Sequence, residues 1–398
     1  MRQIRIPATF MRGGTSNAIV FRQDDLPEDR ELWAEIFAAA IGSPDPNGRQ
    51  LNGMGGGISS LSKVCVVGPP SRDDADIDYT FAQVVIRENR VEFLGNCGNM
   101  SSAMGPFAVD EGIATLDGDS GMIRIHNTNT NKIIHAHFDM DDGLSAVDGD
   151  YELPGVAGQA SAVRLDFMEP GGSFTGKMLP TGAAVDILET PNLGKVEASI
   201  VDASALCVLV EAKTVGLTGV ELPKDLEANP DVLNMLQEIR AAGSVKLGLN
   251  ASIEEAMARI TNRPAIGFVS PAQDAPTLAG DPLKVADGDV TARMISMGDP
   301  HRALPGTCSM CLAVASQIDG TLVNRNLSGP ANGEVRLMHP SGVLHASAAV
   351  RRDGPLWFAE RASLYRTQRR MFDGYVYVPA SRVPKYRAWL DVTAKAAE

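Results

Sequence analysis

Several features that mark common protein classes are missing from this chain of 398 residues. No uninterrupted apolar run reaches the roughly 20 residues of a membrane-spanning helix. Residues 1–17 hold no long apolar stretch either, so we expect no signal peptide and no membrane partner. Lys and Arg number 36 against 49 Asp and Glu, and the net charge of −13 argues against nucleic acid as a partner. An anionic small molecule is compatible with this charge, because local charge decides such binding.

The five cysteines form no pattern typical of disulfides or metal binding. Their number is odd and their spacing irregular, so we expect reduced thiols in a cytoplasmic protein. The one C-x-x-C pair lacks a second ligand pair at zinc spacing. His135 and His137 alternate along one strand without a suitably spaced acidic partner. We also find no dinucleotide, phosphate-loop or serine-hydrolase motif, so we expect neither a metal nor a cofactor. The cysteines are Cys65, Cys97, Cys207, Cys308 and Cys311.

The chain does contain many short strand-like runs and few helical ones, with 39 glycines and only 5% aromatic residues. The two types do not alternate steadily, which favours an α+β fold with antiparallel or mixed sheets. Residues 95–112 (GNCGNMSSAMGPFAVDEG) resemble residues 306–320 (GTCSMCLAVASQIDG), since each is a glycine turn, a cysteine and an apolar helix. We therefore predict two similar halves, residues 1–182 and 183–398, and the last segment is a candidate to pack back on the first.

The glycine turn around Cys97 has a chemical interpretation. A turn that leads into a helix leaves backbone N–H groups without intrahelical partners, and these groups attract negative charge together with the helix dipole. Such a position stabilises a thiolate and also binds a substrate carboxylate or a developing enolate. Gly95 and Gly98 would let the backbone approach a ligand closely. The alternative is a buried cysteine beside a turn that serves only packing.

Two further glycine-rich segments carry candidate groups. In MRGGTSN (residues 11–17), the guanidinium group of Arg12 could bind a carboxylate through two N–H groups, beside the hydroxyls of Thr15 and Ser16. The alternative is an ordinary β-turn with a solvated arginine. In NGMGGGISSLSKVCVV (residues 52–67), Lys63 enters an apolar strand. Partial desolvation there favours the neutral amine that accepts a proton. The alternative is a lysine at a strand edge whose amine reaches water.

Taken together, these motifs resemble the PrpF family. The following segments recur there in the same order over nearly the whole chain: MRGGTSN, IGSPDPNGRQLNGMGGGISSLSKV, YTFAQV, GNCGNMSSAMGPFAVDEG, HNTNTNK, TGKMLPTG, FVSP, HPSGV and GYVYV. The family contains 2-methylaconitate cis-trans isomerases, methylitaconate and aconitate Δ-isomerases and 4-oxalomesaconate tautomerases. The resemblance implies the diaminopimelate-epimerase-like fold, with two pseudo-symmetric domains, each a curved mixed sheet wrapped around a central helix, and a site between them.

The resemblance also implies roles for individual residues. Lys63 and Cys97 fall on the family's proton-transfer pair. The second-half cysteine falls on Cys311, whereas the internal comparison pairs Cys308 with Cys97, so this assignment stays open. The family's usual lysine after GGTS is Asn17 here, and the resemblance therefore does not identify the substrate. The substrate-binding candidates are Arg12, Ser16, Asn17, Asn96, Gly98, Asn99, Ser309, Met310, Cys311, His339 and Ser341.

The leading hypothesis is a cofactor-independent isomerase of a small unsaturated di- or tricarboxylate. One group removes a proton from the allylic carbon, the charge spreads into a carboxylate or carbonyl, and another group returns the proton. Return at the far end shifts the double bond, and return at the same carbon after rotation exchanges cis and trans. The alternatives are a racemase or epimerase in which Cys97 opposes Cys308 or Cys311, and a non-catalytic carboxylate-binding accessory protein. A homodimer is a candidate assembly.

Overall fold

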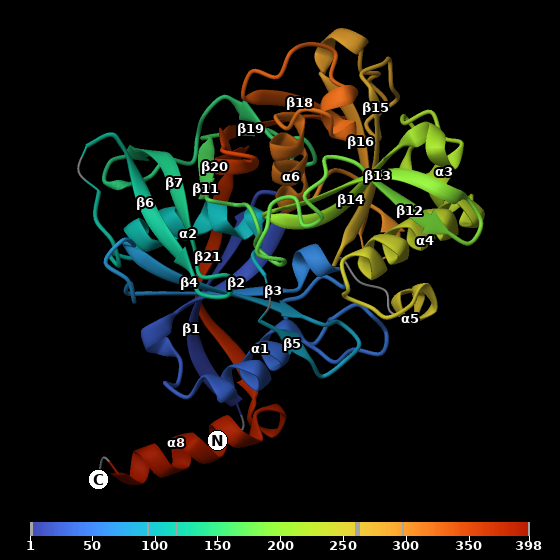
Figure 1. The fold of residues 1–398 in the computed structure, drawn as a ribbon. Helices are drawn as coiled ribbons and strands as arrows, with labels where there is room; N and C mark the ends of the chain where they lie inside the picture. Colours follow the sequence, from blue (N-terminus) through green and yellow to red (C-terminus); the bar gives the residue numbers. More distant parts are fainter. Residues whose placement is uncertain (1–2, 94, 117, 259–262, 297, 397–398) are drawn as a thin grey trace. The chain divides into compact units, whose positions relative to one another are not determined.

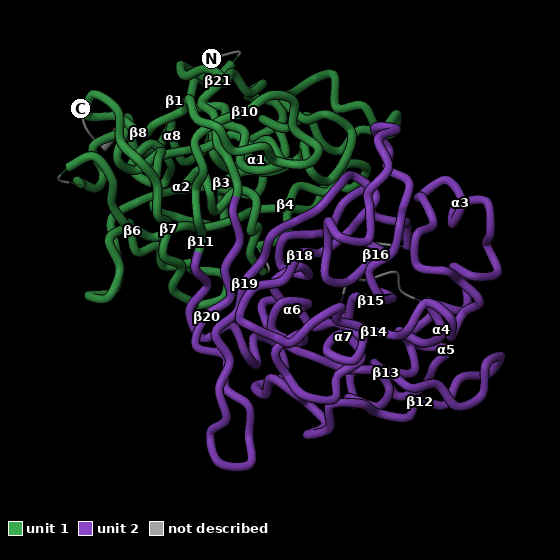
Figure 2. The backbone as a smooth tube through the Cα atoms, turned by 90° about the horizontal axis from the view of Figure 1, so that it is seen from above, with its two compact units in different colours: residues 1–165, 366–398 green, residues 166–365 purple. Residues whose placement is uncertain are grey.

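The computed structural model describes residues 3–93, 95–116, 118–258, 263–296 and 298–396 (Figure 1). The chain divides into two compact units (Figure 2). Unit 1 comprises Met1–Leu165 and Arg366–Glu398, and unit 2 comprises Asp166–Tyr365. Strand β11 (Val163–Met168) leads the chain out of unit 1, and strand β20 (Leu356–Arg366) ends where the chain returns to it.

The boundary lies after residue 165, whereas the sequence placed it after residue 182. The reason is a set of backbone hydrogen bonds that tie the intervening segment to a strand of unit 2. Asp202 accepts a bond from Gly172 N–H (2.8 Å) and donates one to the Met178 carbonyl (2.9 Å). Since isolated backbone groups are costly to bury, these bonds keep residues 170–178 with unit 2.

Unit 1 is built on a mixed sheet in the strand order β21-β1-β2-β3-β4-β6-β7. Neighbours are antiparallel except for β2–β3 and β4–β6, which are parallel. Strand β21 pairs with β1 along its whole length, which is how the last segment packs back on the first unit. The strands are β1 Gln3–Gly13, β2 Ser16–Arg22, β3 Lys63–Gly68, β4 Ile77–Val84, β5 Val91–Glu92, β6 Ser120–Asn127, β7 Lys132–Asp141, β8 Leu144–Ser145, β9 Tyr151–Glu152, β10 Gln159–Ala160 and β21 Gln368–Pro379.

Among the described residues of unit 1, three α-helices accompany this sheet: α1 (Trp33–Ile41), α2 (Gly98–Asp110) and α8 (Pro384–Ala396). Helix α1 buries most of its side chains, and several of them, among them Trp33, Ile36 and Phe37, belong to an apolar cluster of unit 1. Helix α2 is the central one, because it contacts β1, β2, β3, β6, β7, β8 and β21 and nearly all of its side chains are buried. A helix that is apolar on all sides is expected at such a central place.

Unit 2 repeats the arrangement around helix α6. Its strand order is β12-β13-β14-β15-β16-β18-β19-β20, with β14–β15 and β16–β18 parallel and the other neighbours antiparallel. Helix α6 contacts β13, β14, β18 and β19. The elements are β12 Asp186–Thr190, β13 Gly194–Ala203, β14 Ala205–Glu211, α3 Pro223–Glu227, α4 Pro230–Lys246, α5 Ile253–Met257, β15 Ala265–Pro271, β16 Val290–Ser296, β17 Asp299–Pro300, α6 Gly306–Ser316, α7 Leu322–Arg325, β18 Glu334–His339 and β19 Gly342–Asp353.

The two units have the same topology, as the sequence predicted. The series β1-β2-β3-β4-β6-β7 matches β13-β14-β15-β16-β18-β19 in order and in the direction of every pair. An ion pair repeats with it: Arg124 Nη2 lies 2.6 Å from Asp76, and Arg336 Nη2 lies 2.7 Å from Asp289. The predicted α+β fold, two pseudo-symmetric domains each with a mixed sheet around a central helix, is confirmed.

Candidate active site

Cys97 is the residue immediately before helix α2. Its backbone is extended (φ −108°, ψ 97°), its side chain is partly exposed, and its carbonyl accepts the first intrahelical bond from Ser101 N–H at 2.9 Å. The N–H groups of the first turn that follow it have no intrahelical acceptors and point out of the helix end. The predicted arrangement, a thiol at the N-terminus of a helix, is therefore present.

The asparagines on either side of Cys97 hold this turn in place. Asn96 Oδ1 accepts hydrogen bonds from Ser101 Oγ (3.1 Å) and from Asn127 Nδ2 (3.3 Å). Asn99 Nδ2 donates to Thr15 Oγ1 at 3.0 Å, in the turn between β1 and β2. The side chains of both asparagines thus have protein partners on the elements around the helix end.

The β1–β2 turn lies directly against the first turn of α2. A Cβ added to Gly13 would lie 2.7 Å from the Asn99 carbonyl oxygen, and one added to Gly14 would lie 2.4 Å from Asn99 Oδ1. Gly14 also has a positive φ of 52°, which favours glycine. The two glycines of MRGGTSN are needed for this close approach, and Ser16 is buried beside it.

Two arginines stand near this helix end. Arg12 Nη1 donates to the Gly14 carbonyl (3.0 Å) and to Thr367 Oγ1 (2.9 Å), so it braces the turn. Burial lowers the pKa of Arg12, and the charge of Arg369 lowers it further. Arg366 is buried and donates from Nε to Asn99 Oδ1 at 2.9 Å.

Arg366 carries its charge in a setting that makes the charge costly. Burial lowers the pKa of Arg366 to about 10, and the ionised forms of Tyr151 and Cys97 act in the opposite direction. An arginine at this pKa is still protonated near neutral pH. A buried cation therefore lies beside the first turn of α2.

Lys63 is the first residue of β3 and is only 8% exposed. Its Nζ donates to Gln83 Oε1 at 2.7 Å and lies 5.1 Å from the centre of the Phe81 ring. Gln83 is itself fixed, because its Nε2 donates to the Ser62 carbonyl at 2.9 Å. The hydrogen-bond partner of the lysine is thus a neutral amide held in place by the backbone before β3.

Lys63 and Cys97 belong to elements that pack together, because α2, which follows Cys97, contacts β3, which begins at Lys63. Burial raises the pKa of Cys65, the charge of Cys97 raises it further, and Lys63 acts in the opposite direction. Cys65 itself is wholly buried, and its Sγ lies 3.8 Å from Tyr79 Oη, so it is a core residue as expected.

The second-half candidates lie in unit 2, around α6 and the β18–β19 turn. Ser309, Met310 and Cys311 are fully buried in the helix, and Cys311 Sγ donates to the Val201 carbonyl at 3.4 Å. Cys308 is also buried. Hydrogen bonds with Cys308 and Cys311, together with burial, raise the pKa of Cys207 well above its usual value.

His339 and Ser341 form one local structure at the β18–β19 turn. Ser341 N–H donates to His339 Nδ1 at 3.1 Å, and Ser341 Oγ donates to the Arg302 carbonyl at 2.7 Å. These contacts shape the turn, and a ligand-binding role for the two residues stays a prediction.

Several residues that support the site were not among the sequence candidates. Phe81 and Gln83 belong to YTFAQV, and Asn127 and Asn129 belong to HNTNTNK, so their motifs were visible although their contacts were not. Arg366 had no such signal, since it is separated by more than 260 positions from its partner Asn99 (|i−j| = 267). The pairing of β21 with β1 brings the end of the chain, next to Arg366, back to the first strands of unit 1.

The described part of the chain holds no group of three or more His, Cys, Asp or Glu side chains placed to bind a metal ion. Within the same residues, no helix is both long and apolar enough to cross a membrane. The five cysteines are all free thiols.

Comparison with known proteins agrees with this geometry. The chain is 40% identical over 383 residues to 3-methylitaconate isomerase of Eubacterium barkeri, covering 96% of this chain and 99% of that protein. It is 37% identical to 2-methyl-aconitate isomerase of Cupriavidus necator, covering 95% and 98%. A crystal structure of methylitaconate-delta-isomerase superposes with a TM-score of 0.85 at 39% identity, covering 96% and 98%. The profile described as "PrpF protein" matches residues 3–379, and the chain therefore belongs to the PrpF family.

Proposed function

We propose that this protein is a cofactor-independent isomerase that moves a proton within a small unsaturated di- or tricarboxylate. The observation that carries the proposal is the position of the two groups: Cys97 lies at the N-terminus of α2, and α2 packs against β3, the strand that begins with Lys63. Relatives of 37–40% identity bear the names of isomerases of methylitaconate and methylaconitate, which are substrates of this chemical class.

In the proposed reaction, Lys63 and Cys97 act as the acid/base pair. One of them accepts a proton from the sp³ carbon next to the double bond, and the electron pair left behind delocalises into the conjugated carboxylate. The other donates a proton to the far carbon or, after bond rotation, to the same carbon, so the proton count is unchanged. The open N–H groups of the first turn of α2 stabilise the transient negative charge.

The substrate carboxylates need cationic or N–H partners, and unit 1 supplies both. Arg12 and Arg366 place positive charge beside the helix end, and Asn96, Gly98 and Asn99 border it. Arg12 uses one guanidinium nitrogen, Nη1, for the turn contacts described above. We propose that these groups bind substrate together with Ser16 and Asn17. For unit 2, we propose Ser309, Met310, Cys311, His339 and Ser341 as substrate-binding residues.

One observation weighs against the two-thiol racemase. Pro305 occupies the position before α6 that Cys97 occupies before α2, since Ser309 N–H bonds to the Pro305 carbonyl as Ser101 N–H bonds to that of Cys97, both at 2.9 Å. A racemase with two equivalent thiols would need a cysteine there. Cys308 lies within the first turn of α6 and Cys311 one turn further on.

The test is turnover of 2-methylaconitate, methylitaconate, the aconitates and 4-oxalomesaconate in heavy water after exhaustive chelation with EDTA. At least one substrate should isomerise without added nucleotide or metal and should acquire solvent deuterium. Loss of turnover that a single divalent ion restores would contradict the cofactor-independent mechanism. Turnover of none of the panel, with tight binding of several members, would favour the accessory-protein alternative. Cytoplasmic location and a homodimer stay predictions.

A further inference from the structure

The turn between β6 and β7, residues 127–131, makes contacts that reach away from its own hairpin. Asn129 Oδ1 accepts a bond from Phe81 N–H at 2.7 Å, and Asn129 Nδ2 donates to the Phe81 carbonyl at 2.9 Å. The same Nδ2 donates to the Phe93 carbonyl at 2.7 Å. One amide side chain therefore pairs with Phe81 as a neighbouring strand would and ties it to the segment after β5.

The Phe81 contact bears on Lys63. The Phe81 ring lies 5.1 Å from Lys63 Nζ, and Gln83, two residues further along the same strand face, accepts the hydrogen bond from that amine. By holding both backbone groups of Phe81, Asn129 fixes the part of β4 that faces the lysine.

The remaining contacts bear on Cys97. Phe93 precedes Cys97 by four residues, and its carbonyl is held by Asn129. Asn127 is fully buried, and its Nδ2 donates to Asn96 Oδ1 at 3.3 Å. The chain that leads into Cys97 is thus tied to this turn at two points, of which the second is the residue next to the thiol.

We propose that Asn127 and Asn129 are the positioning residues of the proton-transfer pair, with Asn129 setting both Lys63 and Cys97 and Asn127 setting Cys97 alone. This inference rests on the proposed function. Proton transfer requires the donor and acceptor within hydrogen-bond reach of the substrate carbon. A displacement of about 1 Å at such a centre costs roughly a hundredfold in rate.

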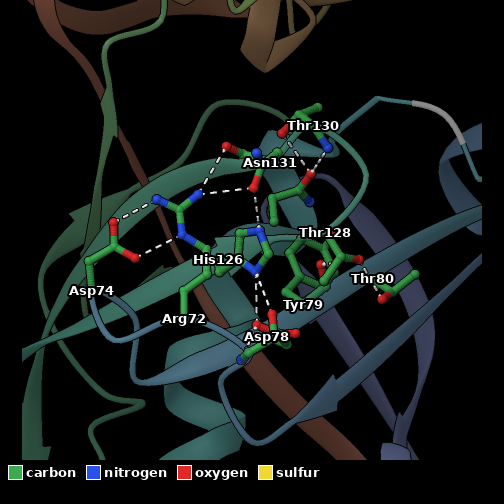
Figure 3. A network of polar contacts seen from close by, with 11 residues as sticks. Arg72, Asp74, Asp78, Tyr79, Thr80, His126, Thr128, Thr130 and Asn131 are labelled. Carbon is green, nitrogen blue, oxygen red and sulfur yellow. Dashed lines mark hydrogen bonds and ion pairs between the residues drawn. The ribbon is translucent and has the colours of Figure 1, made fainter.

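Asn131 of the same turn provides a matched control. Its Oδ1 accepts a hydrogen bond from Arg72 Nη1 (2.9 Å) and lies 3.0 Å from His126 Nε2, with which it also forms a hydrogen bond. Neither Lys63 nor Cys97 belongs to this network (Figure 3). Its φ of 53° suits glycine, so Asn131→Gly removes the side chain without backbone strain.

The experiment compares Asn129→Ala, Asn127→Ala and Asn131→Gly by steady-state kinetics and by the rate of Cys97 alkylation with iodoacetamide. For Asn129→Ala we expect kcat to fall about tenfold to a hundredfold, with KM changing much less. Cys97 alkylation should change in both Asn127→Ala and Asn129→Ala and stay at the wild-type rate in Asn131→Gly. If the turn served only to stabilise the fold, all three variants would show similar changes in kcat and in the rate of Cys97 alkylation.

Wild-type kcat and wild-type alkylation in folded Asn129→Ala would overturn the inference, as would an equal loss in Asn131→Gly. If Asn129→Ala does not fold, Asn129→Asp decides, because it keeps the acceptor for Phe81 N–H and loses only the two donated bonds. It must show the same fall in kcat. Failure of the proposed function is distinguishable, because the wild-type protein would then isomerise none of the panel, or Lys63→Ala and Cys97→Ser would isomerise it as fast as the wild type.

Discussion

Helices α2 and α6 occupy matching places in two units of the same topology, but their first turns differ in chemistry. The residue before α2 is Cys97, and the residue before α6 is Pro305. The strand that starts with Lys63 in unit 1 starts with Ala265 in unit 2. Both units thus keep the sheet around a central helix, and unit 1 alone has an amine and a thiol at these positions.

This difference shows which features the fold itself demands. The open N–H groups of the helix end follow from backbone geometry and are present in both units. The side chains of Lys63 and Cys97, which we propose as the proton-transfer pair, are not needed for the sheet or the helix, since unit 2 forms both with alanine and proline at those positions. We therefore expect catalytic losses to be concentrated in unit 1.

The largest expected effect is a difference in kcat between substitutions near the N-terminus of α2 and substitutions in α6. Lys63→Ala and Cys97→Ser each remove one proton-transfer group, so kcat should fall by about a hundredfold to ten-thousandfold. Cys308→Ala and Cys311→Ala should lower kcat less, because both thiols are buried in packing contacts. Steady-state kinetics on the substrate of the wild-type protein measures all four variants. If Cys308→Ala or Cys311→Ala were inactive while Lys63→Ala stayed fully active, the racemase hypothesis with two thiols would be favoured instead.

The next effect concerns the hairpins that lie against the helices. Gly14→Ser places a Cβ at positive φ and within 3 Å of Asn99 and Arg366 side-chain atoms, so the free energy of unfolding should fall by about 1–3 kcal/mol. Ser204 in unit 2 already has φ 59° with a side chain, so Ser204→Gly should stay within about 1 kcal/mol of wild type. Urea denaturation measures both. Equal losses would show that the close approach at Gly14 is unimportant.

A smaller effect should follow from the buried arginine of unit 1. Arg366→Met removes a buried cation that is hydrogen-bonded to Asn99 in the first turn of α2, so alkylation of Cys97 near neutral pH should slow severalfold. Cys308, in the other unit, should label at an unchanged rate. Mass spectrometry of iodoacetamide-treated protein reads both sites in one experiment. Unchanged Cys97 labelling in the folded variant would remove Arg366 from the site.

The smallest effect tests the symmetry itself. Burial raises the pKa of Asp76, but hydrogen bonds from Arg124 outweigh it and hold that pKa below the usual value; Arg336 does the same for Asp289. A depressed folded-state pKa stabilises the fold above the unfolded pKa of about 3.9, and this contribution disappears as pH falls through the folded value.

Asp76→Asn and Asp289→Asn should therefore each lower the free energy of unfolding by about 1 kcal/mol at pH 7. The difference from wild type should vanish below the folded pKa in strong acid. Denaturant curves at several pH values measure this. Markedly unequal losses would show that the repeated ion pair does not have the same role in the two units.

The candidate site could be predicted from the sequence only where its chemistry is local. A cysteine between two glycines and before an apolar stretch already implies a thiol at a helix N-terminus, and the structure has it. Lys63 at the start of an apolar strand likewise implied partial burial. The partners of these groups were not predictable, because Gln83 reaches Lys63 through strand pairing and Arg366 reaches Asn99 across 267 positions.

The sequence by itself determined the α+β class and the two similar halves, and it supplied the candidates for proton transfer, because strand length, helix ends and residue chemistry depend on short segments. Only the tertiary structure decided the unit boundary after residue 165, which depends on backbone bonds between residues 170–178 and 202–204. It also decided that Pro305, rather than Cys308, is the counterpart of Cys97. Sequence similarity aligns the two cysteines, but the helix begins where its first hydrogen bond forms, and that bond ends at the Pro305 carbonyl.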